Sequence, residues 1–114
     1  MTDCIFCRIA RREIPAEVVE ETPSVIAFKD VHPQAPVHVL VIPKKHIPRG
    51  MDLADEDSAL VADIHRVVQE VARRSGLTDN GFRLVVNNGP FAGQAVDHLH
   101  YHVLGGRKLG WPPG

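Results

Sequence analysis

The chain has few of the features that would direct it to a membrane, a nucleic acid or an oxidising compartment. It has two cysteines, one tryptophan and one tyrosine among 114 residues. No apolar run approaches the ~20 residues that a membrane-spanning helix needs. The formal net charge is −1, from 13 basic and 14 acidic residues, and no long basic run occurs. We therefore expect neither a membrane protein nor an electrostatic nucleic-acid binder.

The two cysteines lie close together near the start of the chain, as Cys4 and Cys7. Such a pair cannot link distant parts of a fold, and it is typical of a reducing compartment. The start of the chain also lacks the layout of a signal peptide. A chain of this length can bury a core without disulfides. We therefore expect a cytoplasmic protein that folds as one domain over residues 1–114.

Three of the seven histidines alternate with apolar residues near the end of the sequence: His98, His100 and His102 are separated by Leu99 and Tyr101. Successive side chains of an extended chain point to opposite faces. The spacing therefore predicts a strand over 98–104 with three imidazoles on one face. Histidine is an uncommon choice for a solvent-facing strand, which favours either a metal site or nucleophilic and acid–base catalysis.

The rest of the pattern predicts an α+β domain. Helices are expected over 5–11 and 52–75, and strands over 17–21, 24–29, 37–43 and 82–88, together with the histidine strand. Mostly short connections favour antiparallel pairing, and the apolar stripe of the long helix is expected to cover one face of the sheet.

Several segments besides the histidine strand carry a family resemblance. They are Ile14-Pro15-Ala16, Phe28-Lys29-Asp30, residues 33–38 and 41–46, Val86-Asn87, Gly93-Gln94, Leu104-Gly105-Gly106-Arg107 and residues 111–114. Together they resemble the histidine triad (HIT) superfamily of nucleotide hydrolases and transferases. The two C-terminal segments resemble its nucleotide-binding branch, called Hint, rather than the dinucleoside polyphosphate hydrolases.

This resemblance implies a HIT-like fold and a homodimer. The fold would be a five-stranded antiparallel sheet with one long and one short helix, and the sheets of two protomers would join into a ten-stranded one. The C-terminal tail 105–114, with Trp111, would lie at the interface and reach toward the partner's site. The implied reaction is hydrolysis of purine nucleoside 5′-phosphoramidates, or of acyl- or aminoacyl-adenylates, to the nucleoside monophosphate, without a catalytic metal.

The resemblance also implies roles for individual residues. His100 would be the nucleophile that forms a nucleotidyl-histidine intermediate, and its other nitrogen would donate to the carbonyl of His98. His102 would contact the phosphate or leaving group and help protonate the departing amine, and His38 would complete the polar wall around the nucleophile. The implied nucleoside pocket comprises Ile5, Phe6, Ile9, Phe28, Lys29, Asp30, Val31 and Leu40. For Phe6, Phe28 and Leu40, a purely structural place in the core fits equally well.

Phosphate contacts are implied at Asn87, Gly93 and Gln94, and the next residue departs from the family pattern. Ala95 stands where the best-known Hint members have a serine whose hydroxyl contacts the scissile phosphoramidate. One hydrogen bond to the reacting group is therefore missing. That absence keeps open the alternative of a nucleotide-binding regulator or scaffold whose slow hydrolysis is incidental. The nearest enzymatic alternative is a dinucleoside polyphosphate hydrolase, and the C-terminal sequence favours the phosphoramidase over it.

The cysteine pair alone fits a redox dithiol, half of a zinc site, or two buried small side chains. Some bacterial relatives with this pair complete a zinc site with the histidine after the lysines and with the first triad histidine. In this sequence those residues are His46 and His98, so the resemblance implies a structural zinc held by Cys4, Cys7, His46 and His98. His32 and His65 receive no role.

Overall fold

A five-stranded antiparallel sheet forms the centre of the protein, and the computed structural model describes residues 4–114. The first three residues of the expected domain lie outside the described part. The strands are β1 (Val18–Glu21), β2 (Val25–Lys29), β3 (Val37–Pro43), β4 (Phe82–Val86) and β5 (Tyr101–Gly105), in the order β1-β2-β3-β5-β4. The helices are α1 (Ile5–Ala10) and α2 (Ser58–Arg74), with 3-10 turns at 50–52, 55–57 and 90–92. The predicted fold class, including one short and one long helix, is confirmed.

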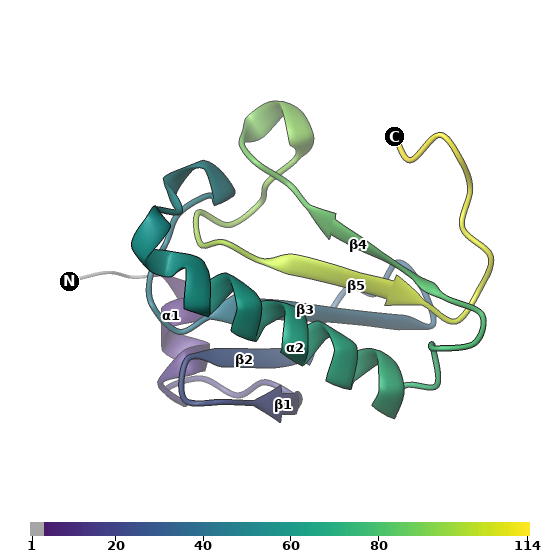
Figure 1. Ribbon diagram of the computed structural model, residues 1–114, viewed down its shortest axis with the longest axis horizontal. Coiled ribbons are helices and arrows are strands. Elements are labelled where there is room, and N and C mark those ends of the chain that lie inside the picture. The colour runs from purple at the N-terminus through teal and green to yellow at the C-terminus, as the bar shows by residue number, and fades with distance from the viewer. Residues whose placement is uncertain (1–3) are drawn as a thin grey trace.

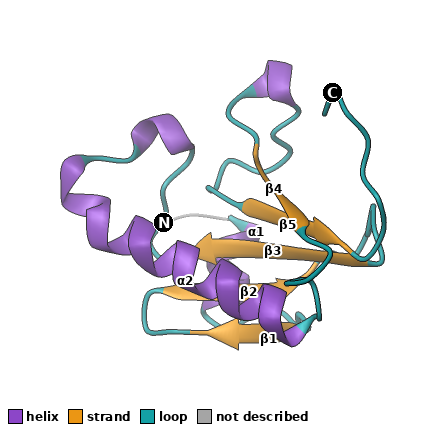
Figure 2. Cartoon of the chain, turned by 45° about the vertical axis from the view of Figure 1, so that its right-hand side comes forward, coloured by secondary structure: helices purple, strands orange, loops and turns teal. Residues whose placement is uncertain are grey.

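Alternation along β3 separates the interior into two layers. Val39 and Val41 face α2, which lies over β1, β2 and β3 (Figures 1 and 2). Leu40 and Ile42 face the opposite side, where they pack against α1. Burying each such side chain contributes roughly 1.5–3 kcal/mol relative to leaving it exposed. Both faces of the sheet therefore carry a buried apolar cluster, one packed against α2 and the other against α1.

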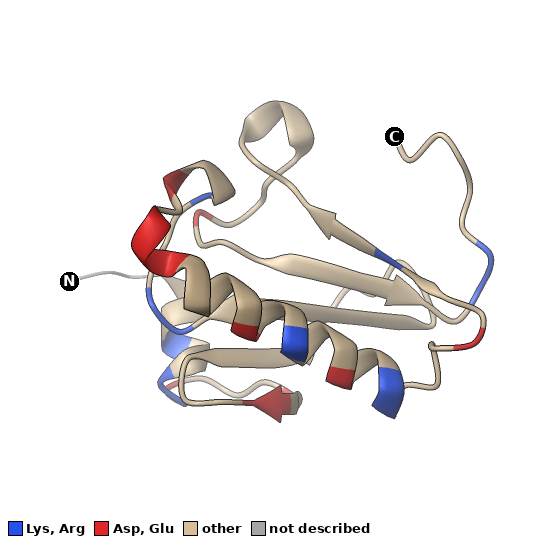
Figure 3. Ribbon diagram, viewed as in Figure 1, with Lys and Arg blue, Asp and Glu red and all other residues tan. Residues whose placement is uncertain are grey.

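The long helix begins later than the sequence predicts, at Ser58 instead of Asp52. Aspartate side chains close the two 3-10 turns that precede it. Asp52 accepts a hydrogen bond from the backbone N–H of Arg49, and Asp57 accepts one from that of Ala54. Aspartate competes with helix formation in this way. The charges still suit the helix dipole, with acidic residues before its start and basic residues in its last turn (Figure 3).

The histidine strand is shorter than predicted, because the ladder of β5 begins at Tyr101. Other bonds hold the preceding residues. The backbone N–H of Leu99 donates to the carbonyl of Ile47 at 2.6 Å, and the ring of His98 bonds through Nε2 to the carbonyl of Pro43 at 2.8 Å. These contacts replace strand pairing at the end of β3. The remaining elements differ from their predicted bounds by at most two residues at an end.

The outer part of the sheet is left uncovered by α2, which contacts β1, β2 and β3. On that face the edge strand β4 carries Phe82, Leu84 and Val86, which are 37–39% exposed. Val61 of α2 is 38% exposed. Within residues 4–114, no helix is long and apolar enough to span a membrane.

Candidate active site

A cavity of about 530 Å³ opens on the α1 side of the sheet. Its walls come from α1, from the end of β2 with the loop that follows, from β3 and from the segment leading into β5. The cavity combines an apolar wall with the imidazoles of His100 and His102. The predicted nucleoside-pocket residues that line it are Ile5, Phe6, Ile9, Phe28, Lys29, Asp30, Val31 and Leu40, and Ala95 lines it as well.

The hydrogen bonding of His100 fixes which of its nitrogens can react. Nδ1 lies 2.8 Å from the carbonyl oxygen of His98. Because a carbonyl oxygen only accepts, Nδ1 carries the proton and Nε2 holds the lone pair. The ring is buried, and the edge of the Phe6 ring packs against it with centroids 5.2 Å apart. The ring of His100 is therefore oriented by this bond, and in its neutral form it presents the Nε2 lone pair at the cavity.

A chain of hydrogen bonds likewise fixes the tautomers of His38 and His102. The backbone N–H of Gln34 donates to Nδ1 of His38 at 3.0 Å, so the ring proton of His38 resides on Nε2. That N–H donates to Nδ1 of His102 at 2.9 Å. The proton of His102 therefore resides on Nε2. This atom is buried and has no hydrogen-bond partner in the described part of the chain, which makes it an available donor beside His100.

Burial keeps both of these rings neutral near pH 7. The pKa of His102 is lowered from 6.5 to about 4, chiefly by desolvation and also by the neighbouring rings of His100 and His38, against the opposing charge of Asp30. Desolvation also lowers the pKa of His38, again against Asp30. The site thus presents His102 as a neutral hydrogen-bond donor rather than as an imidazolium.

Asp30 lies beside this chain. Oδ1 accepts the backbone N–H of His32 at 2.8 Å, and Oδ2 lies 3.4 Å from Nε2 of His38. Ligand atoms of Asp30, His38 and His102 are close enough together for a metal ion. However, the Gln34 amide holds the His38 proton on the nitrogen that would have to coordinate. The group is therefore a hydrogen-bonded chain with one carboxylate beside it.

A second cluster brings together all four predicted metal ligands, Cys4, Cys7, His46 and His98. Nδ1 of His98 lies 3.3 Å from Sγ of Cys4 and 3.6 Å from Sγ of Cys7. Nδ1 of His46 lies 3.2 Å from Sγ of Cys7 and 3.2 Å from Nδ1 of His98. Because Nε2 of His98 donates to the Pro43 carbonyl, its Nδ1 presents a lone pair to the thiols. These four residues can hold a metal ion.

Comparison with known proteins agrees with this arrangement. The HIT domain family model matches residues 11–109. The chain belongs to the HIT domain family. It is 54% identical over 112 residues to an uncharacterized HIT-like protein of Synechocystis sp., a match that covers 98% of this chain and 97% of that protein.

Solved structures agree as well. A HIT family hydrolase from Legionella pneumophila superposes with a TM-score of 0.96 at 50% identity, over 98% of this chain and 100% of the other. A histidine triad protein from Clostridium difficile gives a TM-score of 0.92 at 46% identity, over 96% of each chain.

Of the predicted catalytic residues of this HIT domain, His38 and His98 do not line the cavity. Four predicted nucleotide-binding residues do not line it either: Asn87, Gly93, Gln94 and Trp111. The side chain of Gln94 is bonded to its own loop. It accepts the Gly89 N–H at 2.9 Å and donates to the carbonyls of Pro48 at 2.8 Å and Val96 at 2.9 Å. Trp111 is 81% exposed. Within this chain, Gln94 therefore shapes the loop before the histidines, and Trp111 belongs to the tail.

Sequence reasoning assigned no role to several residues that line the cavity of the HIT domain. They are Ile14, Pro15, Ala16, Glu17, His32 and Val96. The Ile14-Pro15-Ala16 motif was part of the resemblance and could have indicated a wall of the site. No local sequence pattern indicates that His32 and Val96 line the cavity, because their positions depend on how the loops pass over the sheet.

Proposed function

We propose that this protein hydrolyses purine nucleoside 5′-phosphoramidates, or acyl- or aminoacyl-adenylates, to the nucleoside monophosphate. The observation that carries the proposal is the paired orientation of two imidazoles, those of His100 and His102, at one cavity. His100 offers a lone pair on Nε2, and His102 offers a proton on its Nε2. The name of the Legionella pneumophila relative, a HIT family hydrolase, supports a hydrolytic reaction.

In the proposed first step, Nε2 of His100 attacks the α-phosphorus in line with the leaving group. A bond forms between His100 and phosphorus, and the bond from phosphorus to the amine or acyl oxygen breaks with its electron pair going to the leaving atom. A departing amine takes up a proton from solvent, whereas an acyl group leaves as its carboxylate. The ring of His100 becomes cationic, and its Nδ1–H keeps its bond to the His98 carbonyl. That carbonyl stabilises the charge that develops on the ring.

His102 acts in both steps through its Nε2–H. A neutral imidazole with a pKa of about 4 donates a hydrogen bond to a phosphoryl oxygen or to the departing atom without carrying a positive charge itself. Water then attacks phosphorus and gives up a proton to solvent. The phosphorus–nitrogen bond to His100 breaks with its electron pair returning to Nε2, and the nucleoside monophosphate leaves. His38 holds His102 in the required tautomer.

The nucleoside end of the cavity suits a purine. Apolar side chains such as Ile5 and Leu40 line it, and Asp30 lies at its rim with Oδ2 available to a ribose hydroxyl. The family resemblance implies that Asp30 accepts hydrogen bonds from the ribose hydroxyls of an AMP or GMP moiety. Asn87, Gly93 and Gln94, which do not line the cavity, keep the phosphate role that the family resemblance implies.

We further propose that Cys4, Cys7, His46 and His98 hold a structural zinc. A tetrahedral site with zinc–sulfur bonds of ~2.3 Å and zinc–nitrogen bonds of ~2.0 Å places its ligand atoms roughly 3.3–3.8 Å apart. The four separations, 3.2–3.6 Å, lie within that range or about 0.1 Å below it. The ion would tie α1 to the segment that carries the His98 carbonyl. Its thiol ligands must be reduced, which favours the cytoplasm.

The dimer is also a proposal, with a second copy of this chain as the partner. The outer edge of β4 has no strand beside it in the described sheet, and an exposed edge strand is a template for pairing. The adjoining face carries Phe82, Leu84 and Val86, which α2 leaves exposed. In this arrangement residues 1–114 form one domain, and the tail 105–114 with Trp111 lies at the interface.

The test of the proposed function is a steady-state comparison of an adenosine phosphoramidate with a diadenosine polyphosphate. Wild type, His100→Ala and the matched control His65→Ala, an exposed position on α2, are measured side by side. We expect faster turnover of the phosphoramidate, lost in His100→Ala and kept in His65→Ala. Preference for the polyphosphate would favour the second hydrolase class. Nucleotide binding without His100-dependent product release would favour a regulator or scaffold.

A further inference from the structure

One residue of the loop between β2 and β3, Gln34, has both of its backbone groups hydrogen-bonded to side chains. Its N–H donates to Nδ1 of His38. Its carbonyl oxygen accepts a hydrogen bond from the guanidinium of Arg107 at 3.1 Å, across a sequence separation of 73 residues. The loop that sets the His38 tautomer is thus held from the other side by the C-terminal tail.

The C-terminal tail passes close to this loop at Gly106. Gly106 has φ +91°, and a Cβ at this position would lie 2.8 Å from Cβ of Pro36. Only glycine accepts this backbone conformation and this approach without strain. The contact brings the next residue, Arg107, to the carbonyl of Gln34.

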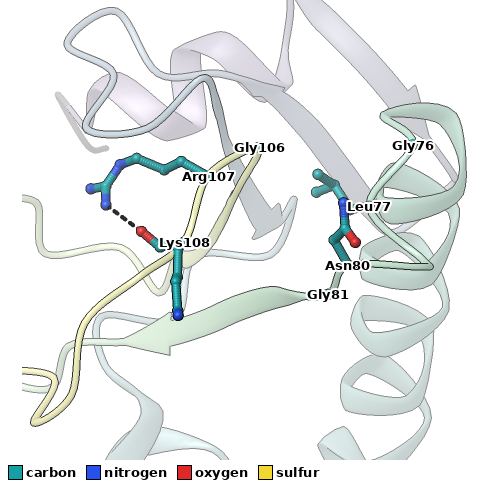
Figure 4. A pocket seen from close by; sticks show the side chains of 7 residues that line it. All are labelled: Gly76, Leu77, Asn80, Gly81, Gly106, Arg107 and Lys108. Atoms are coloured by element: carbon teal, nitrogen blue, oxygen red, sulfur yellow. Dashed lines mark hydrogen bonds between the residues drawn. The ribbon is translucent and has the colours of Figure 1, made fainter.

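Arg107 is itself oriented within the tail. Its guanidinium also donates to the carbonyl of Lys108 at 3.0 Å (Figure 4). Figure 4 shows the Arg107 side chain extending away from Leu77 and Asn80, which lie across the small hollow at the end of α2. The planar fork of arginine can bond two carbonyls at once, which a lysine ammonium does with less geometric definition. Arg107 is exposed and lies outside the cavity.

We propose that Arg107 is a positioning residue for the reaction at His100: its guanidinium holds Gln34 so that the amide fixes the tautomers of His38 and, through it, His102. This inference rests on the proposed function for its catalytic consequence. The tautomers themselves are a property of the free protein.

The alternative arrangement shows why the positioning matters. If the Gln34 amide moves away, Nδ1 of His38 can carry the proton, and its Nε2 then accepts instead of donating. Nδ1 of His102 becomes the donor to His38, and Nε2 of His102 presents a lone pair to the phosphoryl oxygens. The number of protons is unchanged, yet the donor in the site has become an acceptor.

The direct test is the protonation of the ring nitrogens, read from two-bond ¹H–¹⁵N spectra of the free, zinc-loaded protein. In wild type we expect His102 to carry its proton on Nε2 and His38 to have an unprotonated Nδ1. In Arg107→Met both signals should move toward a mixture of tautomers. Lys108→Met, which removes a neighbouring positive charge, should leave them unchanged. Wild-type tautomers in Arg107→Met would overturn the inference.

The kinetic readout separates positioning from substrate binding. For Arg107→Met we expect kcat on the phosphoramidate to fall roughly three- to tenfold, which is the effect of losing one typical hydrogen bond. We expect KM to stay unchanged. A mixed tautomer with wild-type kcat would overturn the catalytic role of Arg107. If wild type turns over no nucleotide at all, the proposed function fails, whereas the ring spectra still decide whether Arg107 sets the tautomers.

A second pair of variants removes the amide without touching the tail. Gln34→Pro deletes the N–H that reaches His38, and Gln34→Ala keeps it while removing the side chain. We expect Gln34→Pro to reproduce the tautomer mixture of Arg107→Met and Gln34→Ala to resemble wild type. Equal spectra from the two Gln34 variants would contradict the role of the amide.

Discussion

Replacing His102 by glutamine should make the stability of the protein less sensitive to acid. His102 has a folded-state pKa of about 4, against an ordinary value of 6.5. Below pH 6.5 the unfolded chain takes up a proton on this ring while the folded protein does not. The contribution of the neutral His102 ring to the free energy of unfolding is therefore fully present above the pKa of this ring in the unfolded chain. It is lost as the pH falls toward the pKa in the folded protein.

The size of the effect follows from the two pKa values. As the pH falls from 7.5 to 5, the full pKa shift of His102 corresponds to a decrease of about 2 kcal/mol in the free energy of unfolding. Because His102 borders a cavity that is open to solvent, screening reduces the expected loss to about 1–2 kcal/mol. His102→Gln removes this contribution, since glutamine does not titrate.

The measurement is the free energy of unfolding in urea at several pH values between 7.5 and 5. Wild type should lose about 1–2 kcal/mol more than His102→Gln over that range. His65→Gln, which removes a histidine from the exposed side of α2, should follow wild type. The other acid-sensitive groups are common to all three proteins, so they cancel in the comparison. Equal pH dependence in wild type and His102→Gln would refute the account of a buried, neutral His102.

Three further predictions address the cavity, the cysteine cluster and the edge strand. Ala95→Ser should raise phosphoramidate turnover about tenfold by restoring a donor at the cavity, and an unchanged or lower kcat would count against that position. Purified wild type should contain about one zinc per chain and Cys4→Ser markedly less by metal analysis; zinc well below one per chain in wild type would remove the proposed site. Leu84→Asp on the uncovered face of β4 should shift the protein from dimer to monomer in light scattering, and a monomeric wild type would contradict the dimer.

Residue spacing was sufficient to predict most of the sheet. The bounds of β3, Val37–Pro43, are as predicted, because alternation reports directly on which face each side chain occupies. Spacing failed where side chains bond the backbone locally. Asp57 closes a turn before α2, and His98 bonds the Pro43 carbonyl before β5 begins. Apolar periodicity carries no information about such bonds.

The sequence predicts which residues gather at the site better than it predicts the hydrogen bonds that orient them. The alternation of His100 and His102 correctly indicated neighbouring rings, whose centroids lie 5.1 Å apart. The bond from a backbone amide at Gln34 to His38 was not predictable, since every residue except proline has such an amide. Its position follows from the path of a loop and from a tail 73 residues away.

The measurement that tests the central claim most directly is capture of the covalent intermediate. Wild-type protein is mixed with an adenosine phosphoramidate, quenched within one turnover under conditions that preserve a phosphorus–nitrogen bond, and examined by intact mass and peptide mapping. The account predicts one adenylyl group per active chain, attached to His100 and absent from His100→Ala. Product formation with no adduct, or an adduct on another residue that persists in His100→Ala, would contradict it.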